Sequence, residues 1–298
     1  MNPTIGIVTV LFNSESVVCD FFMSLNKQTY RDFILYVIDN KSLDNALALT
    51  RQLLKEASFR AVVIENRENY GIAKGNNIGI RKALEDGCDM VLLSNNDVTL
   101  ETNTIEVLLK GMELHKASMV APKIYRYGTN QLWSAGGHFQ KRSGQNIHRG
   151  YGKADKGQYQ KAEQITFSPA CFMLLKKGVF ERIGLMDENY FVYWDDTDFV
   201  FRAIKNHESL WYIPESVVHH KEATSTGVLS YFSIRYHYRN LVYFALKNYT
   251  RPYAIYVIAF NMTYHCYRHA FRWPFSKLRL GLRSFQEGIN YFKTNGSI

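Results

Sequence analysis

The sequence contains few of the features that mark disulfide-rich or secreted proteins. It has six prolines and four cysteines in 298 residues, and Cys19, Cys88, Cys171 and Cys266 stand far apart without paired spacing. These spacings indicate neither a disulfide framework nor a zinc site. The N-terminal residues contain no basic segment before the first apolar run, so we expect no signal peptide and a cytoplasmic location.

Long apolar runs are also missing. The least interrupted stretch, residues 252–267, lacks Asp, Glu, Lys and Arg but includes Asn261, Thr263 and His265. It is too short and too polar for a transmembrane span. A hydrophobic content of 46% is nevertheless enough for a sizeable core, either in one large domain or in a domain with an appendage.

Acidic residues are almost absent from the C-terminal part of the chain. From Val228 to the end there are ten Lys and Arg and one acid, Glu287, so this part carries the net charge of +9. Aromatic residues are interleaved with these bases, which favours contact with an anionic membrane interface or a nucleic acid. The alternative is that they form a small helical core or a dimer interface. We expect a domain of residues 1–227 and a basic, aromatic-rich helical extension of residues 228–298.

Short apolar runs alternate with helical patterns in the first third of the chain. Strands are predicted at residues 4–12, 33–38, 61–64 and 90–94. Apolar residues at helical spacing follow each of the first three runs. Strands that alternate with helices in this way predict an α/β fold with a mostly parallel central sheet.

Polar residues follow each of these four strands. In chain order they are Asn13, Asp39, the glycine- and asparagine-rich loop 69–77, and then Asn95, Asn96 and Asp97. The carboxyl ends of parallel strands meet at one edge of a sheet, so these groups should converge on a ligand-binding crevice. Gly71 and Gly75 would let the backbone approach a phosphate. A simple turn and helix N-cap is the alternative reading of residues 95–97.

The pattern changes after Gly111. Residues 128–157 are rich in Gly, Lys, Gln and Tyr without a sustained period, and we predict an irregular, partly mobile segment over the crevice. A further strand is predicted at residues 168–175, and a short helix around residues 179–183.

The densest polar stretch is a cluster of three carboxylates, Asp195, Asp196 and Asp198, next to Tyr193 and Trp194. These carboxylates repel one another, and this repulsion is costly unless a cation or a bound substrate offsets it. The simpler reading is an N-cap of the following helix. Both can hold, because a partly desolvated carboxylate at a helix N-terminus is well suited to act as a general base.

Two adjacent histidines, His219 and His220, follow a short apolar run. A histidine in this position is often structural. In an extended chain the two side chains point to opposite sides, so at most one of them faces the crevice.

In this order, the motifs resemble the inverting glycosyltransferase family 2, which has a GT-A fold, and look most like its bacterial rhamnosyltransferase-type members. The resemblance covers roughly residues 5–247. It is carried by residues 8–13, 37–42, 69–79, 95–97, 184–188 and 194–198, and by His220 with Ser225. It implies a nucleotide-binding part of about residues 1–115 and an acceptor-binding part of about residues 116–227.

The resemblance implies a hexosyltransferase with a nucleotide-diphosphate sugar as donor. Asp39 would read the pyrimidine, with Thr9, Phe12 and Asn13 beside the base and ribose, and loop 69–77 would close over the nucleotide. The implied donor-binding residues are Thr9, Phe12, Asn13, Asp39, Asn69, Gly71, Asn76, Asn95 and Asn96. Asn95 stands where many relatives have Asp, but Asn is common in rhamnosyltransferase-like members. This favours a deoxythymidine diphosphate rhamnose donor, with a UDP-sugar as the alternative.

By the same resemblance, Asp97 occupies the last position of an Asp-x-Asp motif. It would hold a divalent cation, Mg²⁺ or Mn²⁺, against the diphosphate, with His220 as a second ligand. Asp196 would be the general base that activates the acceptor hydroxyl. Asp195 replaces the usual Glu of the family pair, so it remains a second candidate for the base.

The family also implies an acceptor that is a glycan or a polyprenyl-diphosphate-linked sugar, as in polysaccharide biosynthesis for the cell envelope. The extension would then attach the enzyme peripherally to the anionic inner face of the plasma membrane, or form a homodimer. A non-catalytic nucleic-acid-binding protein would explain the basic extension but leaves Asp195 and Asp196 without a role, so no nucleic acid is expected. A nucleotidyltransferase usually has a basic glycine-rich loop after the first strand, which is missing here.

Overall fold

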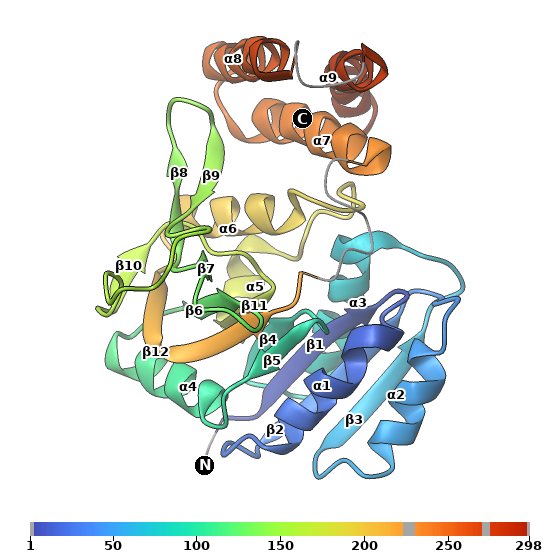
Figure 1. Cartoon of the computed structure of the whole chain (residues 1–298), viewed down its shortest axis with the longest axis vertical. Coiled ribbons are helices and arrows are strands. Elements are labelled where there is room, and N and C mark those ends of the chain that lie inside the picture. The colour runs from blue at the N-terminus through green and yellow to red at the C-terminus, as the bar shows by residue number, and fades with distance from the viewer. Residues whose placement is uncertain (1–2, 223–229, 270–274, 297–298) are drawn as a thin grey trace.

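The computed structural model describes residues 3–222, 230–269 and 275–296 (Figure 1). Most of its strands form one mixed sheet in the order β10-β12-β6-β11-β4-β1-β2-β3, with β5 paired to β12 and β7 to β6. The strands of this sheet are β1 (Ile5–Leu11), β2 (Phe33–Asp39), β3 (Arg60–Glu65), β4 (Met90–Ser94), β5 (Val98–Leu100), β6 (Met119–Arg126), β7 (Leu132–Ser134), β10 (Glu163–Ile165), β11 (Phe172–Lys176) and β12 (Leu210–His220).

Strands β1 to β4 form the parallel half of the sheet, as predicted. Helices cover both faces of this half, which is why its central strands are apolar on both sides. Ile5 and Ile7 of β1 pack in the core shared with α1 (Glu15–Asn26), and the helix α2 (Ala46–Leu54) flanks this face. Val8 packs on the other face, in the core shared with α3 (Gly71–Glu85).

The other half of the sheet is mixed. Strand β11 runs antiparallel to β4 and β6, whereas β12 runs parallel to β6. Helix α4 (Thr104–Leu114) packs against β12 and β6. Helices α5 (Lys177–Ile183) and α6 (Asp195–Lys205) share a core with α3, through Phe180 and Phe199 among others. The strand and the short helix predicted around residues 168–183 are therefore present.

Two local predictions are wrong. Residues 128–157 are not wholly irregular, because they contain β7 and the antiparallel pair β8 (Gly137–Gln140) and β9 (Gln145–His148). The strands of this hairpin are too short to give a clear period in the sequence. The predicted loop 69–77 is mostly helical, since α3 begins at Gly71.

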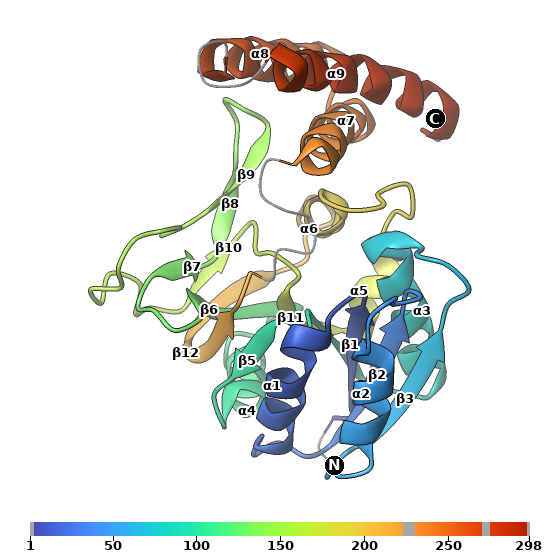
Figure 2. The ribbon, with the colours of Figure 1, turned by 45° about the vertical axis from the view of Figure 1, so that its right-hand side comes forward.

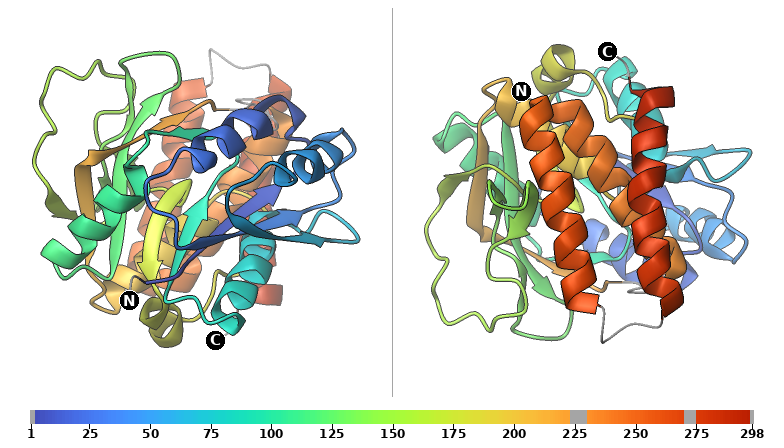
Figure 3. Two further views of the ribbon diagram at one scale, coloured as in Figure 1. Left: turned by 90° about the horizontal axis from the view of Figure 1, so that it is seen from below. Right: turned by 90° about the horizontal axis from the view of Figure 1, so that it is seen from above.

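The predicted C-terminal extension is helical, with α7 (Tyr231–Asn248), α8 (Arg251–His269) and α9 (Phe275–Asn295). Figures 1 and 2 show these helices above α6, with the β8–β9 hairpin reaching up to α8. Seen from above, α8 and α9 form the outermost layer, with α7 behind them (Figure 3). Buried aromatic residues of α7 and α9, such as Phe244 and Phe285, share a core with Tyr190 and Trp194. The predicted boundary near residue 227 and the motif residue Ser225 lie outside the described residues.

None of the helices in the described part of the chain is both long enough and apolar enough to cross a membrane.

Candidate active site

Asp97 and His220 meet at the carboxyl end of the parallel strands. Asp97 follows β4 directly and precedes β5, which pairs antiparallel with the end of β12. This pairing places Asp97 Oδ1 3.1 Å from His220 Nε2. Both side chains are largely buried, and apart from this approach of Nε2 to Asp97 neither ring nitrogen of His220 has a polar partner among the described residues. An imidazole and a carboxylate that lie this close together can supply two ligands to a divalent cation.

His219 points away from this pair, as the alternation of an extended strand requires. Its ring stacks on Tyr125, with 5.7 Å between the ring centroids, and its Nε2 lies 3.1 Å from Glu101 Oε1. Of the two adjacent histidines, His220 is thus the one beside Asp97.

A strained turn delivers Asp195 and Asp196. Tyr193 and Trp194 have φ values of 61° and 71°, and α6 begins at the next residue. Consecutive left-handed residues other than glycine are unusual and must be held by their surroundings. Asp195 is the first helical residue and is buried, whereas Asp196 is partly exposed.

The two adjacent carboxyl groups differ in environment. Asp196 Oδ2 accepts a hydrogen bond from the backbone N–H of Ala170 at 3.3 Å, and Oδ1 accepts one from the Thr197 hydroxyl at 3.2 Å. Burial, followed by the negative charge of Asp196, raises the pKa of Asp195. Asp195 therefore holds its proton to higher pH, which leaves the accessible, hydrogen-bonded Asp196 as the better placed candidate for a general base.

The third carboxylate of this cluster, Asp198, has a structural role. It is fully buried, and it accepts hydrogen bonds from Arg202 Nε at 2.8 Å, Lys247 Nζ at 2.9 Å and Asn248 Nδ2 at 2.7 Å. Lys247 also donates to Asp187 Oδ2 at 2.6 Å. These bonds compensate the buried charge and tie α6 to α7.

Residues of the β8–β9 hairpin join the site, which the sequence did not indicate. Burial lowers the pKa of His148, and the charge of nearby Asp196 opposes this effect. The ring centroids of His148 and His220 lie 5.0 Å and 4.5 Å from the ring centroid of Trp133, each in an edge-to-face contact. Only the tertiary structure reveals that His148 lies near Asp196, because the sequence around His148 has no sustained period.

Cys171, immediately before β11, is buried and feels the charges of both candidate functional carboxylates. Burial raises the pKa of its thiol, and the charges of Asp97 and Asp196 add to this shift. Because both charges act on this one thiol, Asp97 and Asp196 are both in its neighbourhood. The buried thiol is one of the four free cysteines, in agreement with the absence of a predicted disulfide.

The predicted base- and ribose-binding residues lie at the ends of β1, β2 and β4. Buried Asp39 accepts hydrogen bonds from Ser42 N, and Asn13 Oδ1 accepts one from Leu43 N at 2.8 Å. Phe12 is partly exposed and Asn95 is exposed, whereas Asn96 donates to the Val10 carbonyl at 2.7 Å. Thr9 is fully enclosed, so contact with a nucleotide base requires its neighbours to move.

The segment around the start of α3 is occupied by contacts within the protein. Asn69 Oδ1 accepts a hydrogen bond from Gly71 N at 2.9 Å. Gly71 has a φ of 80°, and a Cβ there would lie 2.3 Å from the Phe191 carbonyl oxygen, so glycine is required. Asn76 is buried, and its amide lies 3.7 Å from Met186 Sδ. These contacts are inconsistent with a freely closing loop, and the donor-binding roles of Asn69, Gly71 and Asn76 stay predictions.

Among residues 3–222, 230–269 and 275–296, no group of three or more His, Cys, Asp and Glu side chains is arranged to hold a metal ion. Asp97 and His220 are the pair that could contribute ligands beside further oxygens from a bound diphosphate and water.

Comparison with known proteins identifies the family. The sequence profile of glycosyl transferase family 2 matches residues 6–184, which is more than half of the chain. The chain belongs to glycosyl transferase family 2. It is therefore a glycosyltransferase, and its mixed sheet with flanking helices is a GT-A fold.

Several relatives and structures are similar to this family 2 enzyme. The dTDP-rhamnosyl transferase RfbF of Shigella flexneri is 24% identical over 245 residues, which cover 75% of this chain and 79% of RfbF. The S. aureus TarS 1-349 structure in complex with UDP-GlcNAc has a TM-score of 0.62 and 14% identity, covering 97% of this chain and 81% of that chain. The mannosyltransferase PcManGT from Pyrobaculum calidifontis, in complex with GDP-Man and Mn2+, has a TM-score of 0.60 and 13% identity, covering 100% of this chain and 77% of that chain. At these identities the two structures support the fold alone.

Proposed function

We propose that this glycosyltransferase transfers a sugar, with inversion, from a nucleotide-diphosphate donor to a glycan or lipid-linked glycan. The observation that carries the proposal is the 3.1 Å approach of Asp97 Oδ1 to His220 Nε2 at the carboxyl ends of the parallel strands. A deoxythymidine diphosphate rhamnose donor is favoured by the similarity to RfbF, which is named a dTDP-rhamnosyl transferase. A UDP-sugar is the alternative, since TarS binds UDP-GlcNAc.

A divalent cation, Mg²⁺ or Mn²⁺, fits the Asp97–His220 pair. Within the described part of the chain, the buried ring nitrogens of His220 have no polar partner other than Asp97, which Nε2 approaches, so a metal bond to this pair would satisfy Nε2. A cation bound there would stabilise the negative charge that develops on the leaving nucleotide diphosphate. The Mn2+ in the PcManGT complex supports this type of cofactor.

The donor nucleotide would lie along the ends of β1, β2 and β4. Asp39 would accept a hydrogen bond from the base, with Phe12 and Asn13 beside the base and ribose. Asn95 and Asn96, which directly precede Asp97, would lie near the ribose and diphosphate. Thr9, Asn69, Gly71 and Asn76 belong to the same region and would lie next to the bound donor.

Asp196 would remove the proton from the acceptor hydroxyl. Its carboxylate is partly exposed, and two hydrogen bonds orient it. The raised pKa of Asp195 supports Asp196 over Asp195 as the base, because a carboxyl that keeps its proton cannot accept another. Attack from the side of Asp196, opposite to the leaving diphosphate, would invert the anomeric carbon.

The outer face of α8 and α9 would contact the anionic inner face of the plasma membrane. Exposed apolar side chains, Ile255, Met262, Phe275 and Leu282, lie on these outermost helices. The exposed Arg279 and Arg283 on α9 add positive charge. Apolar side chains flanked by bases are the pattern of peripheral attachment to anionic lipids. Such a location suits a lipid-linked acceptor in polysaccharide biosynthesis for the cell envelope, and a homodimer through this face is the competing outcome.

A donor screen tests the proposed function. The protein is incubated with deoxythymidine diphosphate rhamnose or a UDP-sugar, with Mn²⁺ or with EDTA, and release of nucleotide diphosphate is measured. We expect metal-dependent hydrolysis of one donor and a rise in the melting temperature with that donor. If no nucleotide sugar is hydrolysed or stabilises the protein in either condition, the proposed function is wrong.

A further inference from the structure

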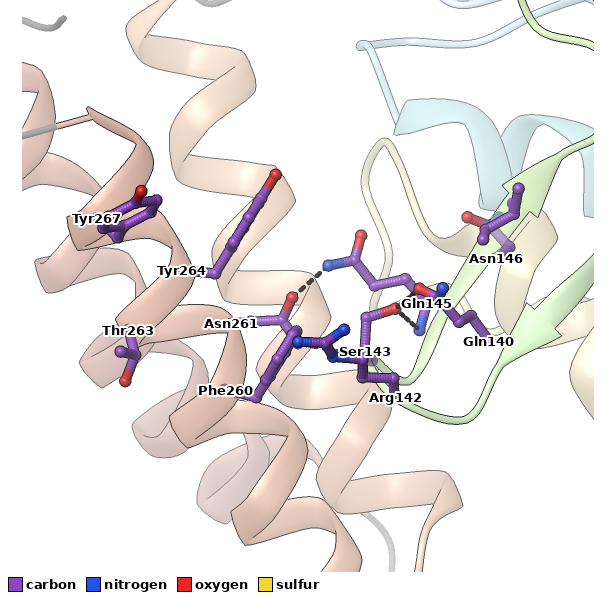
Figure 4. Close-up of a pocket in the computed structure, with 11 residues that line it drawn as sticks. Gln140, Arg142, Ser143, Gln145, Asn146, Phe260, Asn261, Thr263, Tyr264 and Tyr267 are labelled. Carbon is purple, nitrogen blue, oxygen red and sulfur yellow. Dashed lines mark hydrogen bonds between the residues drawn. The ribbon is translucent and has the colours of Figure 1, made fainter.

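We propose that the groove between the β8–β9 hairpin and α8 binds the saccharide part of the acceptor. This inference rests on the function proposed above and assigns the acceptor to a specific surface. The groove has a volume of about 570 Å³ and is shown in Figure 4. The residues that carry the argument are Arg142, Gln145, Asn146, Phe260, Tyr264 and Tyr267.

The lining chemistry fits a carbohydrate. Tyr264 and Tyr267 are 48% and 83% exposed, and the Tyr264 ring stacks on the Phe260 ring with 6.4 Å between the centroids. Together these rings form an aromatic wall of the kind that packs against the C–H face of a sugar. The side-chain carbonyl oxygen of Asn146 offers an acceptor for a sugar hydroxyl, while its amide nitrogen donates to Thr197. The guanidinium of Arg142 lies 5.5 Å from the centroid of the Phe260 ring, which adds a positive charge to an aromatic wall.

The groove is connected to the proposed base. The Asn146 amide donates a hydrogen bond of 2.9 Å to the Thr197 hydroxyl, which donates one of 3.2 Å to Asp196 Oδ1. Asn146 and His148 lie two residues apart on β9, so their side chains leave the strand on one side, toward α6 and the carboxylates. The Asn146 side chain therefore places this end of the groove beside the N-terminus of α6, next to the carboxylate of Asp196.

The walls of the groove are held together in the absence of a ligand. Asn261 Nδ2 on α8 donates to the Ser143 carbonyl at 2.8 Å, and the amide of Gln145 donates to Asn261 Oδ1. The Tyr249 hydroxyl donates to the Gly144 carbonyl at 2.8 Å. Because the side chains of a preformed groove are already ordered, binding a saccharide costs little of their conformational entropy and the affinity is correspondingly higher.

The experiment measures saccharide binding directly. Saturation-transfer NMR is recorded with p-nitrophenyl glycosides of rhamnose, glucose, galactose, mannose and N-acetylglucosamine, on the wild type, Tyr264→Ala and Tyr267→Ala. The matched control is Tyr256→Ala, which changes another tyrosine of α8 that is 46% exposed but does not line the groove. Melting temperatures check that each variant is folded.

We expect at least one glycoside to bind the wild type and Tyr256→Ala, and to bind Tyr264→Ala about tenfold more weakly, since tenfold corresponds to the loss of about one aromatic contact. Absence of binding by every glycoside, or equal binding to Tyr264→Ala and Tyr256→Ala, overturns the assignment. Donor hydrolysis without acceptor is measured on the same wild-type preparation. Its absence would contradict the proposed function separately, because glycoside binding does not depend on turnover.

Discussion

The side-chain amide of Asn240, on α7, donates a hydrogen bond of 2.9 Å to the carbonyl oxygen of Tyr193 and one of 2.8 Å to that of Val192. Asn240 is fully buried. Tyr193 and Trp194 have left-handed backbone conformations, which cost about 1–2 kcal/mol per residue. The first helix of the extension thus stabilises the strained turn that delivers Asp195 and Asp196 to the site.

Removing this amide should loosen the turn. We expect Asn240→Ala to lower the free energy of unfolding by about 1–3 kcal/mol, because two buried carbonyl groups lose their donor. The turnover number for transfer should fall with it, since the base is then less well positioned. Urea unfolding and steady-state kinetics measure the two effects. The control Asn290→Ala changes an exposed asparagine on α9, and an equal loss of stability in both variants would contradict the role of Asn240.

Asp196→Asn tests the proposed base. A positioned general base contributes roughly 10² to 10⁴ in rate, so we expect transfer to fall by that factor while donor binding, measured by calorimetry, stays nearly intact. Asp195→Asn is measured in parallel. Normal turnover by Asp196→Asn would rule out its assignment, and loss of transfer in Asp195→Asn alone would make Asp195 the base.

The cation site is tested with Asp97→Ala and His220→Ala. Each removes one of two ligands, so we expect the Mn²⁺-dependent part of donor binding to be lost in calorimetric titrations. His219→Ala is a matched control, because the adjacent histidine contacts Glu101 on the other side of the strand. Unchanged affinity for donor plus manganese in Asp97→Ala would count against the site.

Stability should depend on pH through Asp195. Its pKa is raised in the folded protein, so above the ordinary pKa of Asp the folded state still holds a proton that the unfolded state has released. The free energy of unfolding therefore falls as pH rises from the ordinary pKa of Asp towards the raised pKa of Asp195. For one group the slope is at most about 1.4 kcal/mol per pH unit. We expect Asp195→Asn to gain stability over the wild type between pH 5 and pH 8 in urea unfolding. A difference that does not change with pH would contradict the buried, protonated carboxyl.

Membrane attachment is tested by flotation with vesicles that contain anionic lipid. We expect the protein to float at low salt and less at high salt, because screening weakens the attraction of Arg279 and Arg283. Ile255→Ser with Met262→Ser should reduce flotation, since both side chains are exposed on α8. If the wild type does not float at low salt, the membrane proposal is wrong, and a dimer in sedimentation would assign this face to self-association.

The parallel half of the sheet and the polar groups at its strand ends could be predicted because both depend on local patterns. An apolar run of strand length followed by Asp39 or by Asp97 is readable without knowledge of partners. The hairpin from Gly137 to His148 was missed because its short strands are stabilised by contacts with α8, as in the bond from Asn261 to Ser143. Helix α3 begins inside the predicted loop because its first turn packs against Phe191, more than a hundred residues away, whose carbonyl accepts a hydrogen bond of 2.8 Å from Ile72 N.

The sequence by itself determined the alternation of strands and helices, the basic extension and the motifs that resemble family 2. Only the tertiary structure decided which carboxylates are available: Asp198 is neutralised by Arg202 and Lys247, whereas Asp196 is partly exposed. It also decided that Asp97 meets His220, which depends on the pairing of β5 with β12. The period of apolar residues in a segment indicates only its local secondary structure. The register between distant strands and the packing of α7 on α6 depend on the whole fold.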